Sequence, residues 1–236
     1  MAKKGGSSHM KRIASPRYVP VARKGKVWVV KPSPGPHRIE DAVALGVVLR
    51  DIMHVADSER EVKRVLTEGN VLVDGRVVRD RKFPVGLMDV VSIPKMNKNY
   101  WVGVDRKGRF KLFEVKDERV KFKLCRVEGK RTVKKGATQI SFHDGRTITD
   151  GRELRVGDTV KLAIPKQQIL SVMKLEPNAV CLITKGIHAG EVAVVEELYH
   201  KTGAKKAEAK LRSGEESFIT VRDYVFVVGD EAQVFK

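Results

Sequence analysis

The segment from residue 57 to residue 93 constrains the fold of this chain more than any other stretch. Ser58 precedes a run with a helical pattern, and Glu61 three residues later completes a reciprocal cap that satisfies free N–H groups at a helix start. Gly69 suits the left-handed position just after a helix end. Asp74-Gly75 then joins two short apolar runs and tolerates the positive φ angles of a two-residue hairpin turn. The segment therefore predicts a helix followed by a tight β-hairpin.

The predicted helix has an aliphatic face and a basic face. At 3.6 residues per turn, Val62, Val65 and Leu66 share one side. The opposite side carries Arg60, Lys63, Arg64 and Thr67. The turn and second arm of the hairpin add Arg76, Arg79, Arg81 and Lys82. We expect the aliphatic face to be buried and the two groups of cations to lie near each other at the surface.

Helix, glycine, strand, tight turn and basic strand in this order resemble the alpha-L RNA-binding motif. That motif is seen in several ribosomal proteins, tyrosyl-tRNA synthetases and pseudouridine synthases. The resemblance implies RNA binding, and the agreement of several independent patterns favours it. The alternative is a solvated basic helix packed on a small sheet.

The charge of the chain indicates a polyanionic partner. Its 236 residues include 47 Lys and Arg against 29 Asp and Glu, a net charge of +18. Nucleic acid fits best, because each phosphate contact releases condensed counterions. The longest apolar run, 42–49, is too short to span a membrane, and the first residues lack the apolar block of a secretory signal. We expect a cytoplasmic protein bound to nucleic acid.

Residues 1–38 form a basic segment that contains ten Lys or Arg and no Asp or Glu. Five prolines prevent a continuous helix. The segment is too polar to build its own core, so we expect it to be extended or disordered by itself. Tyr18 and Trp28 could anchor it on a neighbour, and nucleic acid could order it. A flexible leader is the alternative.

The next two parts of the chain have different patterns. Residues 39–53 are apolar almost all round, which predicts a buried helix. With the helix and hairpin above and a closing strand at 90–93, residues 39–95 are predicted to form one small α+β unit. Residues 96–166 alternate in short runs between turn signals, which predicts an all-β domain, a small barrel or sandwich. We expect its aromatic residues in the core rather than exposed for base stacking.

Residues 167–236 are again rich in strand patterns. Two apolar runs within 180–195 flank a turn with Gly186 and Gly190, and this arrangement resembles the KOW motif of ribosomal proteins and transcription elongation factors. Glycines there permit a sharp loop and a close approach of backbone to phosphate. The motif usually has a third glycine where this chain has Ala193. The resemblance implies an SH3-like barrel, and we expect residues 201–210 to form a mobile loop.

No catalytic, metal or cofactor constellation is evident in the sequence. Cys125 and Cys181 are far apart and have no spaced His nearby, so we expect two small buried apolar side chains. The six histidines show no ligand spacing, and no phosphate-binding glycine loop occurs. His143-Asp144 precedes Gly145 and is predicted to form a turn. We therefore expect no enzyme activity, no metal and no cofactor.

Several blocks follow one another in the order of the archaeal and eukaryotic small-subunit ribosomal protein family S-four-e. They are residues 9–16, 32–37, 75–77, 83–93, 105–110, 123–127, 143–148, 180–195 and 225–229. The resemblance covers nearly the whole chain and implies an α+β multidomain protein. Its parts would be a basic extended N-terminal arm (1–38), an alpha-L module (39–95), a central all-β domain (96–166) and a KOW β-barrel (167–236). The chain has no long basic tail of the eukaryotic kind, which indicates an archaeal source.

The same resemblance implies a constituent of the small (30S) ribosomal subunit that binds and stabilises folded rRNA, next to other small-subunit proteins. A ribosome- or transcription-associated RNA-binding factor is the alternative, and an RNA-modifying enzyme such as a pseudouridine synthase is a weaker one. The predicted RNA-binding residues are Lys11, Arg12, Arg17 and Arg38 from the N-terminal segment, Arg60, Lys63, Arg64, Arg76, Arg79, Arg81 and Lys82 from the alpha-L module, and Lys185, Gly186, His188 and Gly190 from the KOW loop.

Overall fold

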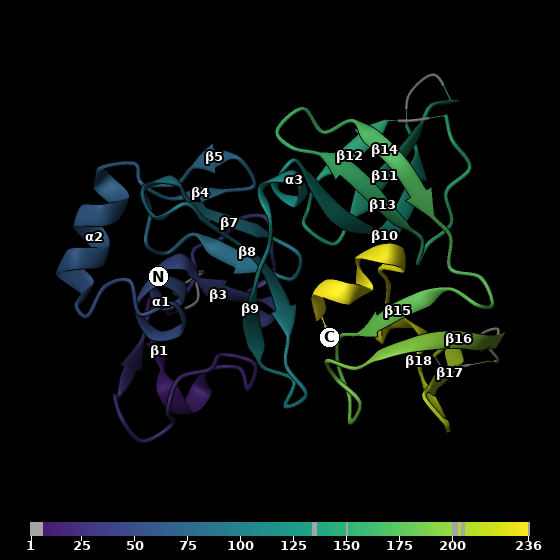
Figure 1. Ribbon diagram of the computed structural model, residues 1–236, viewed down its shortest axis with the longest axis horizontal. Coiled ribbons are helices and arrows are strands. Elements are labelled where there is room, and N and C mark those ends of the chain that lie inside the picture. The colour runs from purple at the N-terminus through teal and green to yellow at the C-terminus, as the bar shows by residue number, and fades with distance from the viewer. Residues whose placement is uncertain (1–6, 134–135, 150, 200–202, 204–205, 236) are drawn as a thin grey trace, which may run out of the picture.

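The computed structural model describes residues 7–133, 136–149, 151–199, 203 and 206–235 of the chain. These residues form mostly strands with a few short helices (Figure 1). Within this described part, three five-stranded sheets and two two-stranded pairs account for the strands, and all paired strands are antiparallel. The predicted α+β class is confirmed.

The first sheet has the strand order β5-β4-β7-β8-β9. Its strands are β4 (Leu72–Val73), β5 (Arg76–Val77), β7 (Val90–Ile93), β8 (Lys98–Val104) and β9 (Phe110–Glu114). The predicted hairpin is confirmed, because β4 pairs with β5 across Asp74 and Gly75, whose φ angles are 50° and 73°. A short 3₁₀ turn, η4 (Pro94–Met96), joins β7 to β8, so this sheet continues past the predicted limit at residue 95.

Helix α2 (Glu59–Thr67) begins and ends as its sequence predicts. The Glu61 N–H donates to Ser58 Oγ over 3.3 Å, and the Glu61 carboxylate accepts from the backbone N–H of Asp57 over 2.9 Å. Gly69 follows the helix with a φ of 75°. Val62 and Leu66 are buried, whereas the basic face is exposed. The predicted amphipathic helix is confirmed.

The helix predicted over 39–53 is wrong for its first half. A 3₁₀ turn, η2 (Ile39–Asp41), leads into strand β3 (Ala42–Ala44), which pairs with β6 (Pro84–Gly86). Helical structure starts only with α1 (Leu45–Val47) and continues as a π-helix, η3 (Val48–Ile52). A run that is apolar on all sides fits a buried strand as well as a buried helix, so periodicity alone could not separate them.

The N-terminal segment is folded against the first sheet, so the prediction of an extended arm is wrong for residues 10–37. Strand β1 (Met10–Lys11) pairs with β2 (Trp28–Val29), and a 3₁₀ turn, η1 (Arg12–Ala14), follows β1. Val19 and Val29 are buried in the same core as the first sheet. The Tyr18 carbonyl accepts from the N–H of Phe110 over 2.9 Å, and the two rings lie 4.9 Å apart. The anchoring role predicted for Tyr18 is therefore confirmed.

The second and third sheets lie to the right in Figure 1, one above the other. The second has the order β12-β11-β10-β13-β14 and the third the order β18-β17-β16-β15-β19. The second comprises β10 (Phe122–Thr132), β11 (Thr138–Phe142), β12 (Thr147–Thr149), β13 (Thr159–Ala163) and β14 (Ile169–Met173), preceded by α3 (Asp117–Val120). The third comprises β15 (Val180–Ile183), β16 (Val192–Tyr199), β17 (Glu208–Ser213), β18 (Glu216–Val221) and β19 (Val225–Val227), with 3₁₀ turns η6 (Arg222–Tyr224) and η7 (Gly229–Phe235).

The three sheets meet in one apolar core. Trp101 of β8, Phe122 of β10 and Leu182 of β15 are buried in the same cluster. Phe235, from the final 3₁₀ turn, stacks on Trp101 with ring centroids 6.1 Å apart. Cys125 and Cys181 are buried in the cores of the second and third sheets, as predicted. Most of the loop predicted at 201–210 lies outside the described residues, and β17 begins at Glu208.

No helix in the described part of the chain is long and apolar enough to cross a membrane.

The β15–β16 loop docks on the turn between β8 and β9. Ala189 is buried in the core of the first sheet. Gly190 has a φ of 81°, and a Cβ on it would lie 2.5 Å from the carbonyl carbon of Asp105. Glycine is therefore required at this position both for its backbone angle and for the close contact between the two loops.

Gly190→Ala should destabilise the fold more than a matched change at Gly214. Gly214 also has a positive φ, 64°, but a Cβ there would meet no atom within 4 Å. Alanine in the left-handed region costs about 1–2 kcal/mol at either position, and the clash with Asp105 adds about 1–3 kcal/mol at Gly190 only. Thermal unfolding of the two variants measures the difference. Equal melting temperatures would show that the loop does not dock in solution.

Candidate RNA-binding surface and the ionic cluster beneath it

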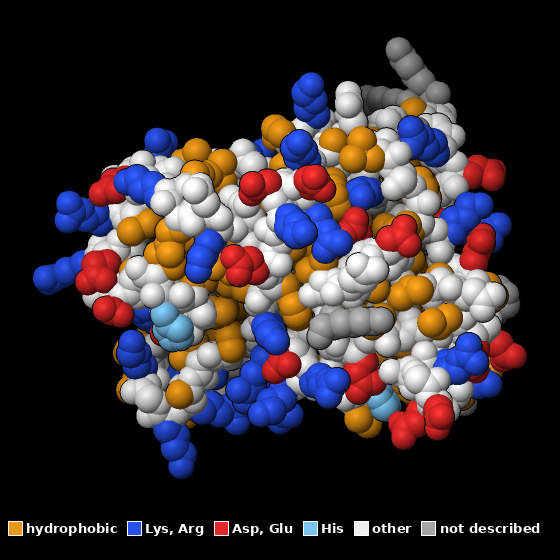
Figure 2. Space-filling view, viewed as in Figure 1, with side chains coloured by type: hydrophobic (Ala, Val, Ile, Leu, Met, Phe, Trp, Pro, Cys, Tyr) orange, Lys and Arg blue, Asp and Glu red, His pale blue; other side chains and the backbone are white. Residues whose placement is uncertain are grey.

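The basic face of α2 is exposed and mostly free of acidic partners. Arg60 and Lys63 make no ion pair within the described residues. Arg64 pairs with Glu68 over 3.3 Å, but its side chain is 84% exposed, and such a surface pair contributes little. In Figure 2, Lys and Arg side chains project from the left edge of the molecule, over α2, with Asp and Glu side chains between them. This edge presents positive charge on a capped, well-packed helix.

The cations of the hairpin arm lie next to this helix, as the sequence predicts. Arg81 Nη1 lies 2.5 Å from the Glu59 carboxylate at the helix start. The guanidinium of Arg79 lies against Gly69 at the helix end. Arg76 is exposed and Lys82 is half-buried. Helix and hairpin thus form one basic edge.

A second group of predicted residues lines a cleft between the sheets. Arg17 and Arg38 come from the N-terminal segment, and Lys185 and Gly186 come from the β15–β16 loop, yet all four line one cavity of about 700 Å³. Lys185 Nζ lies 2.6 Å from the Asp41 carboxylate, which ties the loop to the N-terminal part of the chain. These residues come from two parts of the chain that are distant in sequence, and no residue of α2 lines the cavity.

Arg12 differs from the other predicted contacts because its side chain is buried. Its guanidinium donates to the carbonyl oxygens of Val19, Val21 and Ala22, which belong to the loop that follows it. Burial, together with the nearby Arg23 and Arg109, lowers the pKa of Arg12. All this hydrogen bonding holds the N-terminal segment in shape, so we remove Arg12 from the proposed RNA contacts.

Two residues of the β15–β16 loop have contacts that stabilise the loop itself. The ring of His188 stacks on Phe218 at 3.8 Å with an interplanar angle of 14°, and its Nδ1 lies 3.3 Å from the Glu191 carboxylate. Gly190 packs on Asp105, as described above. Lys185 and Gly186 are exposed and make no comparable contact that stabilises the loop. They are the better candidates for contact with RNA.

Three cations on the β8–β9 turn are not among the residues that the sequence predicts to contact RNA. Arg106, Lys107 and Arg109 are exposed. The turn lies beside Ala189 and Gly190 of the β15–β16 loop. Figure 2 shows Lys and Arg side chains gathered in the lower part of the view, over the N-terminal segment that is purple in Figure 1. Three cations within four residues were the available signal, but this stretch served only as a turn signal and as one block of the family resemblance.

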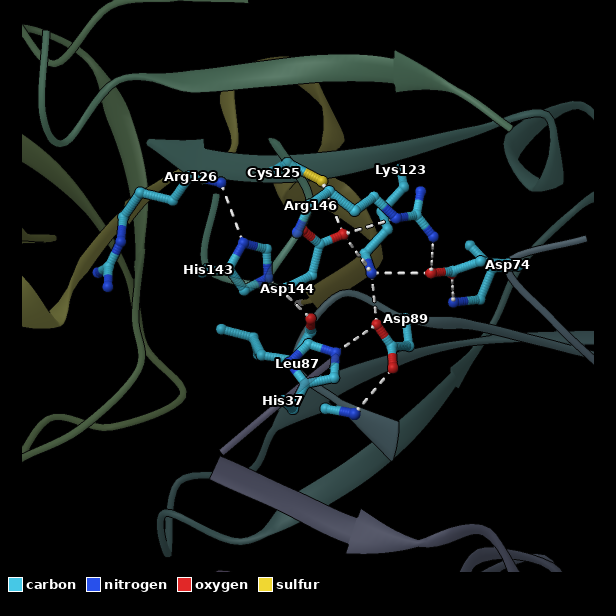
Figure 3. Close-up of polar contacts among 12 residues, drawn as sticks. His37, Asp74, Leu87, Asp89, Lys123, Cys125, Arg126, His143, Asp144 and Arg146 are labelled. Carbon is cyan, nitrogen blue, oxygen red and sulfur yellow. Dashed lines mark hydrogen bonds and ion pairs between the residues drawn. The ribbon is translucent and has the colours of Figure 1, made fainter. Parts of the chain in front are cut away.

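A buried ionic cluster lies beneath these surfaces, at the junction of the sheets (Figure 3). Lys123 of β10 is fully buried, and its ammonium lies 2.9 Å from Asp74, 2.5 Å from Asp89 and 3.1 Å from Asp144. Arg146 also contacts Asp74, over 2.6 Å, and Asp144, over 3.2 Å. The hairpin turn of the first sheet is thereby joined to the second sheet.

The proline-rich segment at 32–37 reaches the same cluster. His37 Nε2 lies 2.8 Å from Asp89 Oδ1. A Cβ on Gly86 would lie 2.4 Å from the His37 ring, and one on Gly145 would lie 2.8 Å from the Pro36 carbonyl oxygen. The glycines thus leave room for the segment to thread between the first two sheets. The predicted turn at His143-Asp144 is confirmed, since Gly145 has a φ of 73°, but the sequence did not reveal the ionic role of Asp144.

Charge pairing sets the protonation of the cluster. Burial acts to raise the pKa of Asp144, but Lys123, His143 and Arg146 together lower it to about 2. The pKa of Asp89 is likewise lowered by His37 and Lys123 against the effect of burial. Burial prevails at Asp74 and raises its pKa. Burial lowers the pKa of Lys123, but its three carboxylates outweigh this and hold the pKa well above the ordinary value. In the described residues, no group of three or more His, Cys, Asp or Glu is arranged to hold a metal ion.

His143 is a neutral bridge beside the cluster. Its Nδ1 accepts from the backbone N–H of Arg126 over 3.1 Å, so Nε2 carries the proton and donates to the Leu87 carbonyl oxygen over 3.1 Å. Burial lowers the pKa of His143 to about 3. At neutral pH the ring therefore bonds to β10 of its own sheet and, through one hydrogen bond, to the segment between β6 and β7.

Family models match three parts of the chain. The RS4NT domain model matches residues 4–40, the S4 domain model matches residues 47–91, and the model described as "Ribosomal family S4e" matches residues 96–169. The S4 domain match covers α2 and the hairpin, which carry the basic edge.

Curated proteins resemble the chain over its full length. The small ribosomal subunit protein eS4 of Methanothermobacter thermautotrophicus is 43% identical over 99% of this chain and 97% of its own. The protein of the same name from Methanocaldococcus jannaschii is 41% identical over the whole of both chains. A crystal structure of the 30S ribosomal protein S4e from Thermoplasma acidophilum matches with a TM-score of 0.71 and 31% identity, over 83% of this chain and 99% of that one.

Lys123→Met should cost about 3–5 kcal/mol of unfolding free energy. The change keeps the four-atom apolar stem but removes the ammonium, which leaves three buried carboxylates without their central cation. Urea denaturation at pH 7 measures the loss.

Lys174→Met is the matched control, because Lys174 is 63% exposed and lies 3.8 Å from its partner Glu176. We expect its unfolding free energy to stay within about 0.5 kcal/mol of the parent protein. A similar small effect at Lys123 would contradict the ionic role of the cluster.

His143→Gln should make stability less sensitive to acid. The folded-state pKa of about 3 lies below the unfolded value of about 6.5, so the unfolded state binds the proton first. Stability from His143 is complete above pH 6.5 and falls by about 1.4 kcal/mol for each pH unit from there toward pH 3. The variant should have a lower melting temperature than the parent protein at pH 7. Between pH 6.5 and pH 4, however, its unfolding free energy should fall less than that of the parent. Equal slopes in this window would refute the neutral bridge.

Proposed function

The chain belongs to the ribosomal S4e family, and from this premise we propose that it is a structural constituent of the small ribosomal subunit that binds and stabilises folded rRNA. Relatives that share about 40% identity over the full chain carry the name of that subunit. The S4 domain supplies RNA binding. The net charge of +18 agrees with a permanent polyanionic partner.

The basic edge of α2 and the hairpin is the observation that carries this proposal. Arg60 and Lys63 project from a helix whose ends are capped and whose aliphatic side is buried. The Arg81–Glu59 ion pair holds the hairpin arm against that helix. Fixed cations of this kind contact phosphates and set the orientation of a protein on structured RNA, which is recognised largely by shape and backbone.

The finer assignment divides the chain into four parts. Residues 1–38 are the N-terminal extension, 39–95 the alpha-L module, 96–166 the central β domain and 167–236 an SH3-like KOW barrel. Support for the last comes from the five antiparallel strands of the third sheet and the glycine loop between β15 and β16. Arg17, Arg38, Lys185 and Gly186, with the added Arg106 and Lys107, form a second RNA-contacting side around the cleft and the adjacent turn.

The role is scaffolding in the cytoplasmic ribosome. The partners are the small-subunit rRNA and neighbouring proteins of the same subunit. The names of the relatives describe ribosomal proteins, and none describes a reaction. The charged surfaces neutralise phosphates where RNA helices approach each other, and neither a cofactor nor a small-molecule substrate enters this role.

Replacing Arg60, Lys63 and Arg64 together by Ala should weaken rRNA binding without unfolding the protein. The three side chains are exposed, so the melting temperature should change little. Each lost phosphate contact lowers the slope of log K against log salt by about one, so the triple variant should lose about three from that slope. Filter binding to small-subunit rRNA over a salt series measures it.

Lys116, Lys121 and Lys166 changed together to Ala are the matched control. These lysines are also exposed, and they lie near α3 and the β13–β14 turn. Their replacement removes the same number of positive charges as the α2 variant. We expect the slope to fall by less than in the α2 variant. Equal losses in both variants would mean that net charge alone, and not the α2 edge, binds the RNA.

A further inference from the structure

Trp28 is a tryptophan whose side chain is more than half exposed. Its side chain is on β2 of the N-terminal ribbon and is 56% exposed, whereas the other tryptophan of the chain, Trp101, is 1% exposed. Along β2 the neighbouring Val29 faces the core and is buried. The alternation of the strand therefore places Trp28 on the outer face of the ribbon, where a large apolar ring contacts water.

The surroundings of Trp28 are cationic and aromatic. Lys11 lies directly opposite in the register of the ribbon, and its Nζ is 5.9 Å from the centre of the Trp28 ring. The ring of His9 lies 5.8 Å away and is tilted by 59°, so it does not stack flat on the indole. Lys24 and Lys26 are exposed in the same loop just before β2.

The charge around this ring distinguishes nucleic acid from a protein partner. The first acidic residue of the chain is Glu40, so the ribbon and its loop carry cations only. A base stacked on the indole would place its phosphates within reach of Lys11 and the lysines before β2. Aromatic rings beside cations bind unpaired bases in this way, since every base has a flat face whereas paired bases are already stacked on their neighbours.

We propose that Trp28, with Lys11 across the ribbon, is a stacking platform for one unpaired base of the bound RNA. The inference rests on the proposed function and adds a defined subsite to it. The basic edges of the molecule bind phosphates of folded RNA, whereas this subsite requires a nucleotide that has left its helix. Lys11 holds the phosphate side of that nucleotide and Trp28 the base.

The full-length protein carries its own reporter. Trp28→Phe leaves Trp101 as the single tryptophan, so the difference between the emission of the parent protein and that of this variant belongs to Trp28. Small-subunit rRNA should quench the emission of Trp28 and protect it from iodide. A fully paired RNA duplex at the same phosphate concentration should do neither.

Binding to small-subunit rRNA completes the experiment. Trp28→Ala should lower the affinity about tenfold with an unchanged salt slope, because stacking releases no counterions, and Trp28→Phe should stay within about threefold of the parent protein. Lys11→Ala should instead lower the slope by about one. Ile13→Ser, at a residue of the same region that is 80% exposed, is the matched control and should bind as the parent does.

The outcomes separate this inference from the proposed function. If the parent protein binds rRNA while Trp28 stays unquenched, or if Trp28→Ala binds as tightly as the parent, the platform is refuted and the proposed function stands. Equal losses in Trp28→Ala and Ile13→Ser would also refute it, since a general apolar contact would then explain the binding. If the parent protein does not bind rRNA, both the platform and the proposed function are refuted.

Discussion

The ammonium of Lys123, surrounded by three aspartates, is the interaction on which the arrangement of this protein depends. Taking these charges out of water is costly, and the cost is offset only because every member of the cluster has partners at hydrogen-bond distance. Buried ion pairs often stabilise a protein no more than an apolar core of the same volume. We infer that the cluster fixes how the sheets are oriented relative to one another. The Lys123 ammonium reaches all three carboxylates in only one placement of the sheets.

The positions of the carboxylates in the chain show how the buried cluster is connected to surface residues. Asp74 is in the hairpin turn, two residues before β5, and Asp89 directly precedes β7. Through His37, Asp89 also fixes the proline-rich segment that leads to Arg38 at the cleft. Two of the proposed RNA contacts, Arg76 and Arg38, are therefore one or two residues away from groups that are held in the interior. Cations held in this way lose little conformational freedom on binding, which favours recognition of a fixed RNA shape.

Local patterns made α2 and its hairpin predictable, whereas the junction of the sheets depends on distant residues. Ser58, Glu61 and Gly69 act within a few residues of each other, so the sequence itself contains their whole physical reason. Lys123, in contrast, is a single lysine in a strand pattern, and Asp74 precedes it by 49 residues. Nothing near Lys123 distinguishes it from the exposed lysines that surround it in the sequence. Its role follows only from the meeting of two sheets and the segment that threads between them.

The same limit explains why some predicted RNA contacts are exposed whereas others are engaged within the protein. A cation is attracted to carbonyl oxygens as well as to phosphates. The sequence around Arg12 does not reveal that its guanidinium donates to three carbonyl oxygens of the loop that follows it. A glycine gives freedom of backbone as well as close approach, and at Gly190 the partner is the backbone of Asp105 rather than a phosphate. The exposed cations of α2 escape this ambiguity, because a helical pattern that fixes the buried side also fixes the opposite one. Sequence therefore predicts which cations are exposed best where a regular element determines which way they point, and least well in loops whose own backbone competes for the same groups.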